Sequence, residues 1–315
     1  MSFIKIIRSY FIHLILALAF SLCCSTVSVA KSSPKSQYRT PEGYWLAYAK
    51  GPDGKQYKRI SDHIGLINLI IISPHDRNLI TEGSEMRRKF IDSVIGQIDK
   101  VYLKRVIDYN KILTQRNSLL KYFFINKKFD ENTIDAYDQQ LISLGTPIYT
   151  ERNRFLKSFI PIFKKYYNNI SSGDDSVNIK FNSHLNEGSF KEIINSSISK
   201  DRFVQYTTKG IHKDDLEFLI DGNKIKNFGS QGQQKSFLVS LKLAQFEYYK
   251  DQLGSSPIVL LDDIFDKLDQ SRVSQIVNIL EKNEFGQIFI TDTHRERVED
   301  ALKDSSNKEE IFNIE

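Results

Sequence analysis

Two short stretches in the last third of the chain contain the residue types that bind phosphate and magnesium. The first is Phe228–Lys235, with the sequence Phe-Gly-Ser-Gln-Gly-Gln-Gln-Lys, and a helical pattern follows it. Ser230 suits a helix N-cap, because its hydroxyl can accept a hydrogen bond from a free amide of the first turn. Free amides and the helix dipole attract anions, phosphate above all. Taken alone, this stretch is also compatible with an ordinary capped helix.

The second stretch is the apolar run Pro257–Leu261, which ends in Asp262 and Asp263. An apolar run before two carboxylates is typical of a buried strand whose end emerges at a site. In nucleotide hydrolases one carboxylate holds magnesium and another polarises the attacking water. The alternative is a strand followed by a solvated acidic turn. A later apolar strand, Gln287–Ile290, ends in Thr-Asp-Thr-His.

Together the two stretches resemble a known family. The order Ser-Gln-Gly-Gln-Gln-Lys, helix, Leu-Leu-Asp-Asp-Ile-Phe-Asp-Lys-Leu-Asp is similar to the RecF family of bacterial recombinational repair proteins, which are ATPases of the ABC/SMC type. The resemblance runs from Gly51 to Glu315 and includes the blocks Lys58–Gly65 and Glu82–Asp92. It departs from the family pattern at His75, where the family usually has an acid.

The resemblance implies roles for single residues. In the family the first motif is a signature loop that contacts the nucleotide held by the opposite subunit of a dimer. Here that loop consists of Ser230, Gln231, Gly232, Gln233 and Gln234. The resemblance also implies a magnesium ligand at Asp262, a catalytic acid at Asp263, a D-loop at Asp269 and a switch residue at His294. The cofactors it implies are ATP and Mg²⁺.

One family element does not occur in these residues. Family members open with a Gly-x-x-Gly-x-Gly-Lys-Thr phosphate loop, and the 315 residues contain no such motif. A P-loop holds the β- and γ-phosphates with backbone amides and a lysine, and its hydroxyl binds magnesium. We therefore expect weak ATP affinity and poor ATPase activity from a head whose N-terminal lobe is incomplete.

Residues Met1 to Ala30 have the layout of a secretory signal peptide. Lys5 and Arg8 precede an apolar run, and Val-Ser-Val-Ala follows it. We favour a non-native start joined to a repair gene by truncation or rearrangement, since the rest of the chain suits a compartment that contains ATP. This interpretation predicts a cytoplasmic protein without stable membrane association. A secreted or periplasmic binding protein is the alternative.

The composition is that of a globular protein with room for two domains: 40% hydrophobic, 26% charged and a net charge of +5. Residues 87–128 combine apolar residues at helical spacing with many Lys and Arg. This pattern fits either a solvated helical face or a basic arm lying on DNA phosphates. The resemblance favours the arm. Its candidate DNA-binding residues are Arg87, Arg88, Lys89, Lys104, Arg105 and Arg116.

Further elements follow from local patterns. We predict helices over 132–144 and 190–199, a helix that starts at Thr146-Pro147 and is kinked by Pro161, and a strand over 177–181. The aromatic stripe through Phe155, Phe159, Phe163 and Tyr167 is interpreted as packing. An Asp-Gly turn joins a hairpin over 216–228, and a last strand covers 311–314. The cluster around His212, Asp214 and Asp215 is interpreted as a polar turn rather than a metal site.

The predicted fold is α/β, an ABC/SMC-type ATPase head with an incomplete N-terminal lobe and an inserted helical arm. Its expected parts are a leader and linker (1–36), a lobe remnant (37–80), the arm (81–205) and a C-terminal lobe (206–315). The resemblance implies ATP-regulated binding to DNA gaps and single-strand/double-strand junctions in repair, replication, recombination and the SOS response. It implies an ATP-dependent homodimer, RecO and RecR as partners, and help in loading the strand-exchange protein. An ATP-independent DNA-binding remnant is the alternative.

Overall fold

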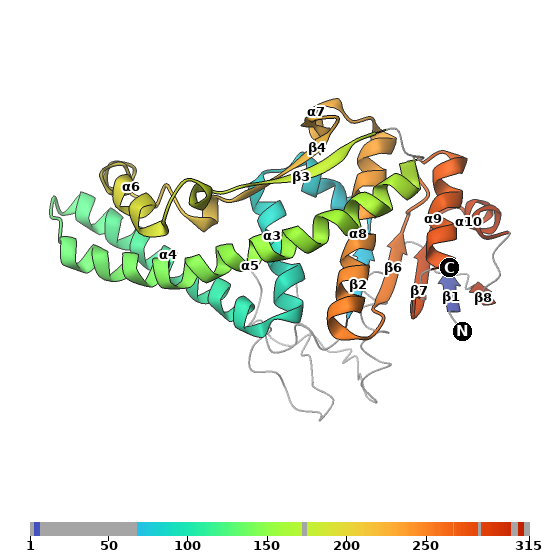
Figure 1. Cartoon of the computed structure of the whole chain (residues 1–315), viewed down its shortest axis with the longest axis horizontal. Helices are drawn as coiled ribbons and strands as arrows, with labels where there is room; N and C mark the ends of the chain where they lie inside the picture. The colour runs from blue at the N-terminus through green and yellow to red at the C-terminus, as the bar shows by residue number, and fades with distance from the viewer. Residues whose placement is uncertain are drawn as a thin grey trace, which may run out of the picture.

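The computed structural model describes residues 3–6, 68–171, 175–266, 268–282, 285–303 and 308–311. Its centre is a parallel sheet in the order β2-β6-β7-β1-β8, seen from left to right on the right of Figure 1. The strands are β1 (Phe3–Ile6), β2 (Leu69–Ile72), β6 (Ile258–Asp262), β7 (Gln287–Thr291) and β8 (Lys308–Ile311). Since all of these pairs are parallel, their carboxyl ends share one edge, and Asp262 lies opposite Thr291.

A second, antiparallel sheet has the order β3-β4-β5. Its strands are β3 (Val177–Asn182), β4 (Asp215–Ile220) and β5 (Asn223–Lys224). The alternating burial of Val177, Asn178 and Ile179 confirms the strand predicted from their alternation. Asp221 and Gly222 both have positive φ, 47° and 76°, as the predicted Asp-Gly hairpin turn requires.

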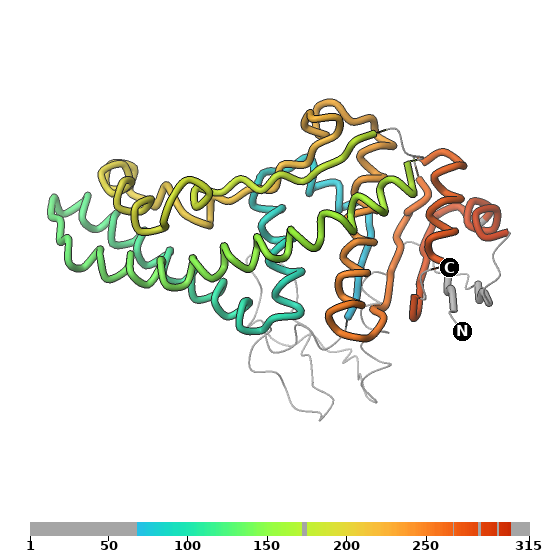
Figure 2. The backbone as a smooth tube through the Cα atoms, viewed as in Figure 1, coloured from blue at the N-terminus to red at the C-terminus, as the bar shows by residue number. Residues whose placement is uncertain are grey.

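Seven helices of eight or more residues accompany the two sheets in the part of the chain that the structure describes. They are α3 (Ser84–Ile98), α4 (Lys100–Ile125), α5 (Glu131–Ser171), α6 (Phe190–Val204), α8 (Gln231–Leu253), α9 (Gln270–Lys282) and α10 (Arg295–Leu302). Shorter turns are η2 (Pro74–Arg77), α2 (Asn78–Thr81), η3 (His184–Asn186), η4 (Ile211–Lys213) and α7 (Ile225–Phe228). Figures 1 and 2 show α4, the first part of α5, and α6 extending away from the parallel sheet, and we call these three helices the arm.

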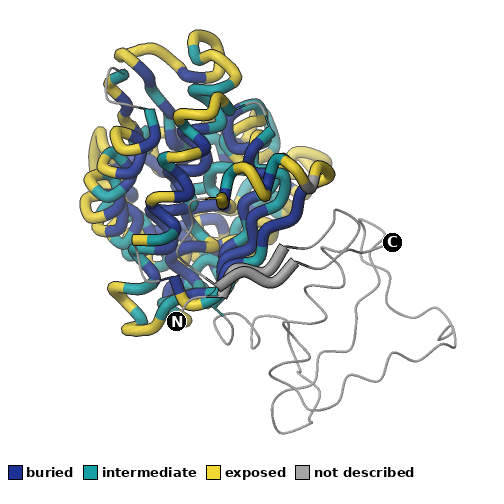
Figure 3. Tube along the Cα trace, turned by 90° about the vertical axis from the view of Figure 1, so that its right-hand side faces the viewer, coloured by how far each residue is buried: buried dark blue, intermediate teal, exposed yellow. Residues whose placement is uncertain are grey.

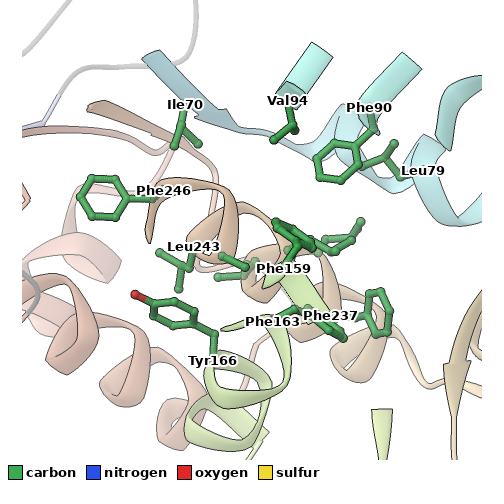
Figure 4. Close-up of a cluster of buried hydrophobic side chains, with 14 of the residues drawn as sticks. Ile70, Leu79, Phe90, Val94, Phe159, Phe163, Tyr166, Phe237, Leu243 and Phe246 are labelled. Carbon is green, nitrogen blue, oxygen red and sulfur yellow. The ribbon is translucent and has the colours of Figure 1, made fainter. Parts of the chain in front are cut away.

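The hydrophobic core joins the base of the arm to the head, by which we mean the parallel sheet and the helices packed against it. Phe159 and Phe163 of α5 lie beside α8, where the rings of Phe163 and Phe237 have centroids 4.6 Å apart (Figure 4). Ile70 of β2 and Val94 of α3 belong to the same cluster. The predicted packing role of the aromatic stripe is confirmed, because all four of its side chains are buried. Burying such side chains stabilises the fold by about 2 kcal/mol each.

The turned view in Figure 3 shows where burial is concentrated. Buried positions, in dark blue, gather between the helices and the sheet, and exposed positions lie on loops and outer helix faces. In the part of the chain that the structure describes, no helix is both long and apolar enough to cross a bilayer.

The predicted continuous helix over 87–128 is interrupted at one residue. Asp99 is in an extended conformation, and its carboxylate accepts hydrogen bonds from the amides of Val101 and Tyr102. An aspartate at this position caps a new helix more favourably than it continues the old one. The basic run is therefore divided between α3 and α4.

The predicted helix start at Pro147 is wrong. Helix α5 passes through Pro147 and Pro161 without ending. A proline inside a helix costs about 3 kcal/mol. Leu141 and Ile148, on either side of Pro147, are fully buried, and this packing offsets the cost of the lost hydrogen bond.

Three other predicted boundaries differ. The return strand of the hairpin is only Asn223–Lys224, and Ile225–Phe228 forms a helical turn in place of the predicted strand. Helix α6 extends to Val204, five residues beyond the predicted end. The last strand is β8 at Lys308–Ile311, earlier than predicted.

The amino-terminal segment contributes to the head at one point. Residues 3–6, which were expected to belong to a leader, form β1 and pair in parallel with both β7 and β8. A gap between those two strands would leave backbone groups unpaired, and an extended segment satisfies them. The remaining predictions for residues 7–67, which include the rest of the leader and linker and the block Lys58–Gly65, fall outside the described residues.

Candidate nucleotide-binding site

The start of α8 is built as an N-cap. Ser230 is extended, its hydroxyl accepts a hydrogen bond from the amide of Gln233, and the Gln233 side chain accepts one from the Ser230 amide. This reciprocal pair is a capping box, in which Gln replaces the more common Glu. The preceding Gly229 has no room for a side chain, because a Cβ there would lie 2.6 Å from Ile225 Cγ1. Local sequence alone therefore determines where this helix begins.

The capped helix end is also tied to α5. Gln233 Nε2 donates a hydrogen bond to Asp175 Oδ1 at 3.1 Å, and Tyr167 of α5 donates to Asp175 Oδ2 at 2.8 Å. Gln234 Nε2 instead donates to the carbonyl of Gly229 at 2.9 Å. These contacts fix the orientation of the first turn relative to the base of the arm.

The carboxyl end of β6 carries the two acidic residues. Thr291, on the neighbouring strand β7, donates a hydrogen bond from Oγ1 to Asp262 Oδ1 at 2.5 Å. The amide of Asp263 donates to the carbonyl of Thr291 at 2.9 Å. Asp263 has a φ of 48°, a left-handed conformation that is uncommon outside glycine and clusters at functional sites. The carboxylate of Asp263 lies 3.4 Å from Arg297 Nη1.

Lys235 of α8 connects the helix to the acidic turn. Its ammonium group donates to the carbonyl oxygens of Asp263 at 2.8 Å and Asp266 at 2.6 Å. The helix start and the strand end therefore line one cleft of about 110 Å³. Its polar lining residues are Ser73, Asp76, Arg77, Gln231, Gln234, Lys235, Asp262, Asp263 and Asp266. The first turn of α8 and the acidic pair therefore share this cleft.

Asp76 and Arg77 were not among the predicted site residues. Asp76 follows β2, where its carboxylate accepts a hydrogen bond from the Ser73 amide at 2.8 Å and pairs with Lys242 of α8 at 2.8 Å. The signal in the sequence was an acidic residue three positions after a serine at the end of an apolar strand, the pattern of a capping box.

A cluster of charges follows β7. Arg297 Nη1 lies 3.4 Å from Asp263 Oδ1 and 3.5 Å from Asp292 Oδ2. Its Nη2 lies 3.2 Å from His294 Nδ1, which must accept because a guanidinium only donates. His294 is thus connected to the second carboxylate through Arg297. Asp292 and Arg297 are site residues that the sequence alone did not single out.

The pKa of Asp263 is raised, although two cations lie beside its carboxylate. Burial raises the pKa of Asp263, and the nearby carboxylates of Asp292 and Asp266 raise it further. Lys235 and Arg297 act in the opposite direction, but they do not cancel the increase. A carboxylate with a raised pKa is better suited to accept a proton near neutral pH.

The other predicted site residues lie outside the cleft lining. Ser230, Gly232 and Gln233 form the tip of α8 rather than the cleft wall. Asp269 accepts a hydrogen bond from the Arg272 amide and pairs with its guanidinium at 2.9 Å. It therefore sits at the start of α9, away from the acidic pair.

Comparison with known proteins identifies the family. The "DNA replication and repair protein RecF" of Flavobacterium johnsoniae is 53% identical over 262 residues, which cover 83% of this chain and 73% of that protein. The chain belongs to the RecF family. RecF of Phocaeicola vulgatus is 45% identical over 262 residues, covering 83% of this chain and 70% of that protein. No family model matches the chain.

Solved RecF structures agree with the fold. One, described as "the recombination mediator protein RecF-ATPrS in RecFOR pathway", covers 94% of this chain and 88% of its own with a TM-score of 0.74 at 26% identity. Another, described as RecF-ATP in the same pathway, has a TM-score of 0.69 at 29% identity and covers 77% of this chain and 66% of its own. The predicted family is confirmed, and the chain is a RecF-type protein of DNA replication and recombinational repair.

RecF membership turns attention to the basic residues predicted to contact DNA. Lys104 is exposed and Arg105 is half-buried on α4, and Lys89 is exposed but pairs with Glu85 at 2.8 Å. Arg88 donates to the carbonyl of Asp214 at 2.7 Å from a half-buried position. These residues keep at least part of their side chains near the surface.

Arg116 and Arg87 require correction. Arg116 has no exposed surface, and its guanidinium donates to Asp138 and Asp201, with Nη1 2.8 Å from Asp201 Oδ2. A side chain enclosed in this way cannot reach a DNA phosphate, so its assignment to the DNA-binding surface is wrong. Arg87 pairs with Asp215 at 2.7 Å, and only 13% of its side chain is exposed. Arg116 instead holds the arm helices α4, α5 and α6 together, and Arg87 holds α3 to β4.

The cluster around His212 is likewise part of the packing. His212 lies between Tyr109, 3.0 Å from Nδ1, and the Thr207 carbonyl, 3.0 Å from Nε2. Asp214 pairs with Arg152 at 2.7 Å. The predicted polar turn is η4, and its side chains form a network that joins α4 and α5 to the segment before β4.

Proposed function

We propose that this RecF-type chain binds DNA at gaps and single-strand/double-strand junctions, and that nucleotide held between two heads regulates the binding. The observation that supports this most directly is the shared cleft at the start of α8 and the end of β6. It places Gln231 and Gln234, from the first turn of α8, beside two adjacent carboxylates, and the free amides of such a turn favour an anion. A solvated acidic turn would not need Lys235 and Thr291 to hold it in place.

The tip of α8 is available to a second head. Ser230 and Gln231 are exposed, and Gly232 is half-buried, so the first turn presents its backbone to the surroundings. The capping box uses the amides of Ser230 and Gln233, and the remaining free amides of the first turn point along the helix axis. In this proposal Ser230, Gln231, Gly232, Gln233 and Gln234 contact nucleotide bound by the opposite subunit of an ATP-dependent homodimer.

The carboxylates fit Mg²⁺ that is bound together with nucleotide. Magnesium takes oxygen ligands, and usually one or two carboxylates complete a shell of waters and phosphate oxygens. Asp262 is half-buried and its Oδ1 is oriented by Thr291, which leaves Oδ2 as the proposed metal ligand. Across the described ranges no group of three or more His, Cys, Asp or Glu side chains could hold a metal by itself. The bound metal would supply charge neutralisation at the phosphates.

Asp263 is the proposed catalytic residue. With a raised pKa its carboxylate can orient a water and accept its proton. Arg297 contacts Asp263, Asp292 and His294. It therefore holds the Asp263 carboxylate in position and connects it to His294, the proposed switch residue. Asp269, at the start of α9, keeps its proposed D-loop role at the dimer surface.

The absent P-loop motif limits catalysis by these 315 residues. A P-loop supplies most of the contacts to β- and γ-phosphate, and among the described residues that line the cleft there are one lysine and one arginine. We therefore propose that the chain on its own is a poor ATPase. Any ATP turnover by the purified protein should be unchanged by Asp263→Asn. Turnover that this substitution abolishes would contradict this part of the proposal.

Partners and compartment follow from the family. The solved relative is described as a recombination mediator in the RecFOR pathway. We propose that this chain likewise works with RecO and RecR in loading the strand-exchange protein, in the cytoplasm where its DNA and ATP are found. Lys89, Lys104 and Arg105 are the members of the predicted DNA-binding set that we carry forward, with Arg88 in a lesser role.

Fluorescence anisotropy with labelled DNA tests the proposal. Gapped duplex should bind more tightly than blunt duplex, and the binding should weaken steeply with salt, since each phosphate contact releases counterions. ATP with Mg²⁺ should change the affinity for wild type and not for Asp262→Asn. Binding that is salt-sensitive but indifferent to ATP would favour an ATP-independent DNA-binding protein, an alternative that the missing P-loop motif supports. No binding to any DNA would overturn both.

A further inference from the structure

The far end of the arm carries an open groove that the nucleotide site does not explain. It lies where α4 ends and α6 passes beside it, at the left of Figure 1 and far from the parallel sheet. Its volume is about 600 Å³, within the range of clefts that hold small ligands. We call it the tip groove, and the residues that matter in it are Phe124, Lys127, Lys128, Phe129, Arg202 and Phe203.

Aromatic rings in the tip groove face solvent. Phe203 is 79% exposed and Phe124 is 54% exposed, although both are large apolar side chains. Phe129 is half-buried behind them and packs edge-on against Phe123, with centroids 5.4 Å apart. Single exposed apolar residues are common, but several gathered around one groove indicate a binding surface.

Cations surround these rings. The guanidinium of Arg202 lies 3.9 Å from the centroid of the Phe129 ring, so it stays at the groove wall. Lys127 and Lys128 are exposed, and no ion pair joins either of them to a residue that the structure describes. Lys127 has a φ of 50°, a conformation in which glycine is the usual residue at a helix end. Among the described residues lining the groove there is no carboxylate to balance these three charges.

The basic character continues along α4 toward the head. Lys100, Lys104 and Lys111 are exposed, and the helical period places them within about 40° of one another on one face. Over its 26 residues α4 contains a single acidic side chain, Asp108. Helix α4 is about 39 Å long, which matches roughly eleven base pairs of duplex DNA. By the same period, the groove-lining residues Leu120, Phe123 and Phe124 lie on the opposite side of α4, so these lysines would contact phosphates outside the groove.

We propose that the tip groove binds unpaired DNA bases, which stack on Phe203 and Phe124 while the flanking phosphates pair with Lys127, Lys128 and Arg202. The inference rests on the proposed DNA binding and adds to it a means of recognising a junction. Exposed aromatic rings beside cations form the usual platform for single-stranded nucleic acid, because every base has a face that can stack. The three cations at the groove, with no carboxylate among its described lining residues, favour the anionic backbone of DNA over a neutral peptide.

The test compares a short duplex carrying a single-stranded thymidine overhang with the same duplex in blunt form. Stacking on one aromatic residue changes affinity by about 5- to 150-fold per base. Phe203→Leu, which keeps an apolar side chain but removes the ring, should weaken overhang binding at least about fivefold and leave blunt-duplex binding unchanged. Phe203→Trp should restore it. The double variant Lys127→Ala/Lys128→Ala should reduce the slope of log affinity against log salt concentration by the amount expected for about two phosphate contacts.

Ile125→Ala is the matched control. Ile125 is 74% exposed at the same helix end and is not part of the groove lining, so its variant should bind both DNAs like wild type. A second readout is the fluorescence of 2-aminopurine in the overhang, which stacking should quench in wild type and Phe203→Trp but not in Phe203→Leu. Because Phe203 is largely exposed, none of these variants should lose its fold.

Three results would decide against the inference in distinguishable ways. Overhang binding unchanged in both Phe203→Leu and Phe124→Leu would overturn the stacking site while leaving DNA binding by the chain intact. Saturable binding of an acidic (Glu-Phe)ₙ peptide that is lost in Phe203→Leu, together with unchanged overhang binding, would identify the groove as a protein-docking site. Failure of the wild-type chain to bind either DNA would instead overturn the proposed function itself.

Discussion

Lys235 Nζ lies 2.8 Å from the carbonyl oxygen of Asp263, so the helix that begins at the signature-like motif also holds the turn that carries the proposed catalytic carboxylate. The same ammonium reaches the Asp266 carbonyl at 2.6 Å. A movement of α8 would therefore change the position of the acidic turn. Lys235 therefore links the signature-like motif mechanically to the acidic turn, although most of α8 separates the two in the sequence.

Replacing Lys235 with Met should loosen that turn. The substitution removes two charge-assisted hydrogen bonds and keeps the aliphatic part of the side chain, so we expect the free energy of unfolding to fall by about 2–3 kcal/mol. Urea denaturation at neutral pH measures it. Lys157→Met is the control, since Lys157 is exposed on α5, and its effect should stay within about 0.5 kcal/mol. Equal effects of the two variants would show that Lys235 contributes little.

Thr291 and Asp262 should be energetically coupled across β7 and β6. Thr291→Val preserves shape but removes the donor to Asp262 Oδ1, and should cost about 1–3 kcal/mol of stability. In the Asp262→Ala background the same change should cost much less, because its partner is gone. A double-mutant cycle measures the coupling energy, which we expect to be about 1–2 kcal/mol. Additive effects would mean that the hydrogen bond does not orient Asp262.

Arg116 and Lys104 should affect different properties of the arm. Arg116→Met leaves Asp138 and Asp201 buried without their partner, and we expect a loss of about 3–5 kcal/mol in unfolding free energy. Denaturation followed by circular dichroism measures this loss. DNA affinity per folded molecule should stay unchanged at a temperature where the variant is folded.

Lys104→Ala is the matched variant on the same helix. Lys104 is exposed, so stability should hardly change, but DNA affinity should fall and its salt slope should decrease by about one phosphate contact. Anisotropy titrations across a salt series measure the slope. If Arg116→Met weakened DNA binding more than Lys104→Ala while remaining fully folded, the buried arginine would have to reach DNA in another conformation.

His212 should make stability depend on pH. Burial lowers the pKa of His212 to about 4, and the charges of Lys213 and Arg88 also lower it, against the Thr207 hydrogen bond and Asp201. The unfolded chain therefore binds a proton near pH 6.5 that the folded chain does not bind until about pH 4. Stability is fully present above pH 6.5 and is lost as the pH falls through this window, by up to about 3 kcal/mol.

A non-titrating variant checks this origin. His212→Gln keeps a donor and an acceptor near Tyr109 and Thr207 but cannot gain a charge. Its free energy of unfolding should be lower than that of wild type at pH 7.5 and should decline less between pH 6.5 and pH 4. Parallel pH profiles for the two proteins would assign the loss of stability to other groups.

How much could be predicted from the sequence depended on the range of the interactions. The cap at Ser230, the strand before Asp262, the hairpin turn at Asp221 and the buried aromatic stripe were all predicted, because each is determined by residues within a few positions of one another.

The tertiary structure decided what the long side chains do. Arg116 and Lys104 look alike in a basic helical run, but only the packing of α5 and α6 against α4 encloses one and exposes the other. The same holds for Pro147, which looks like a helix start until the burial on both sides of it is known. The tip groove likewise exists only because α6 passes beside the end of α4. Contacts between residues far apart in the chain depend on how elements pack, and local sequence patterns contain no measure of that packing.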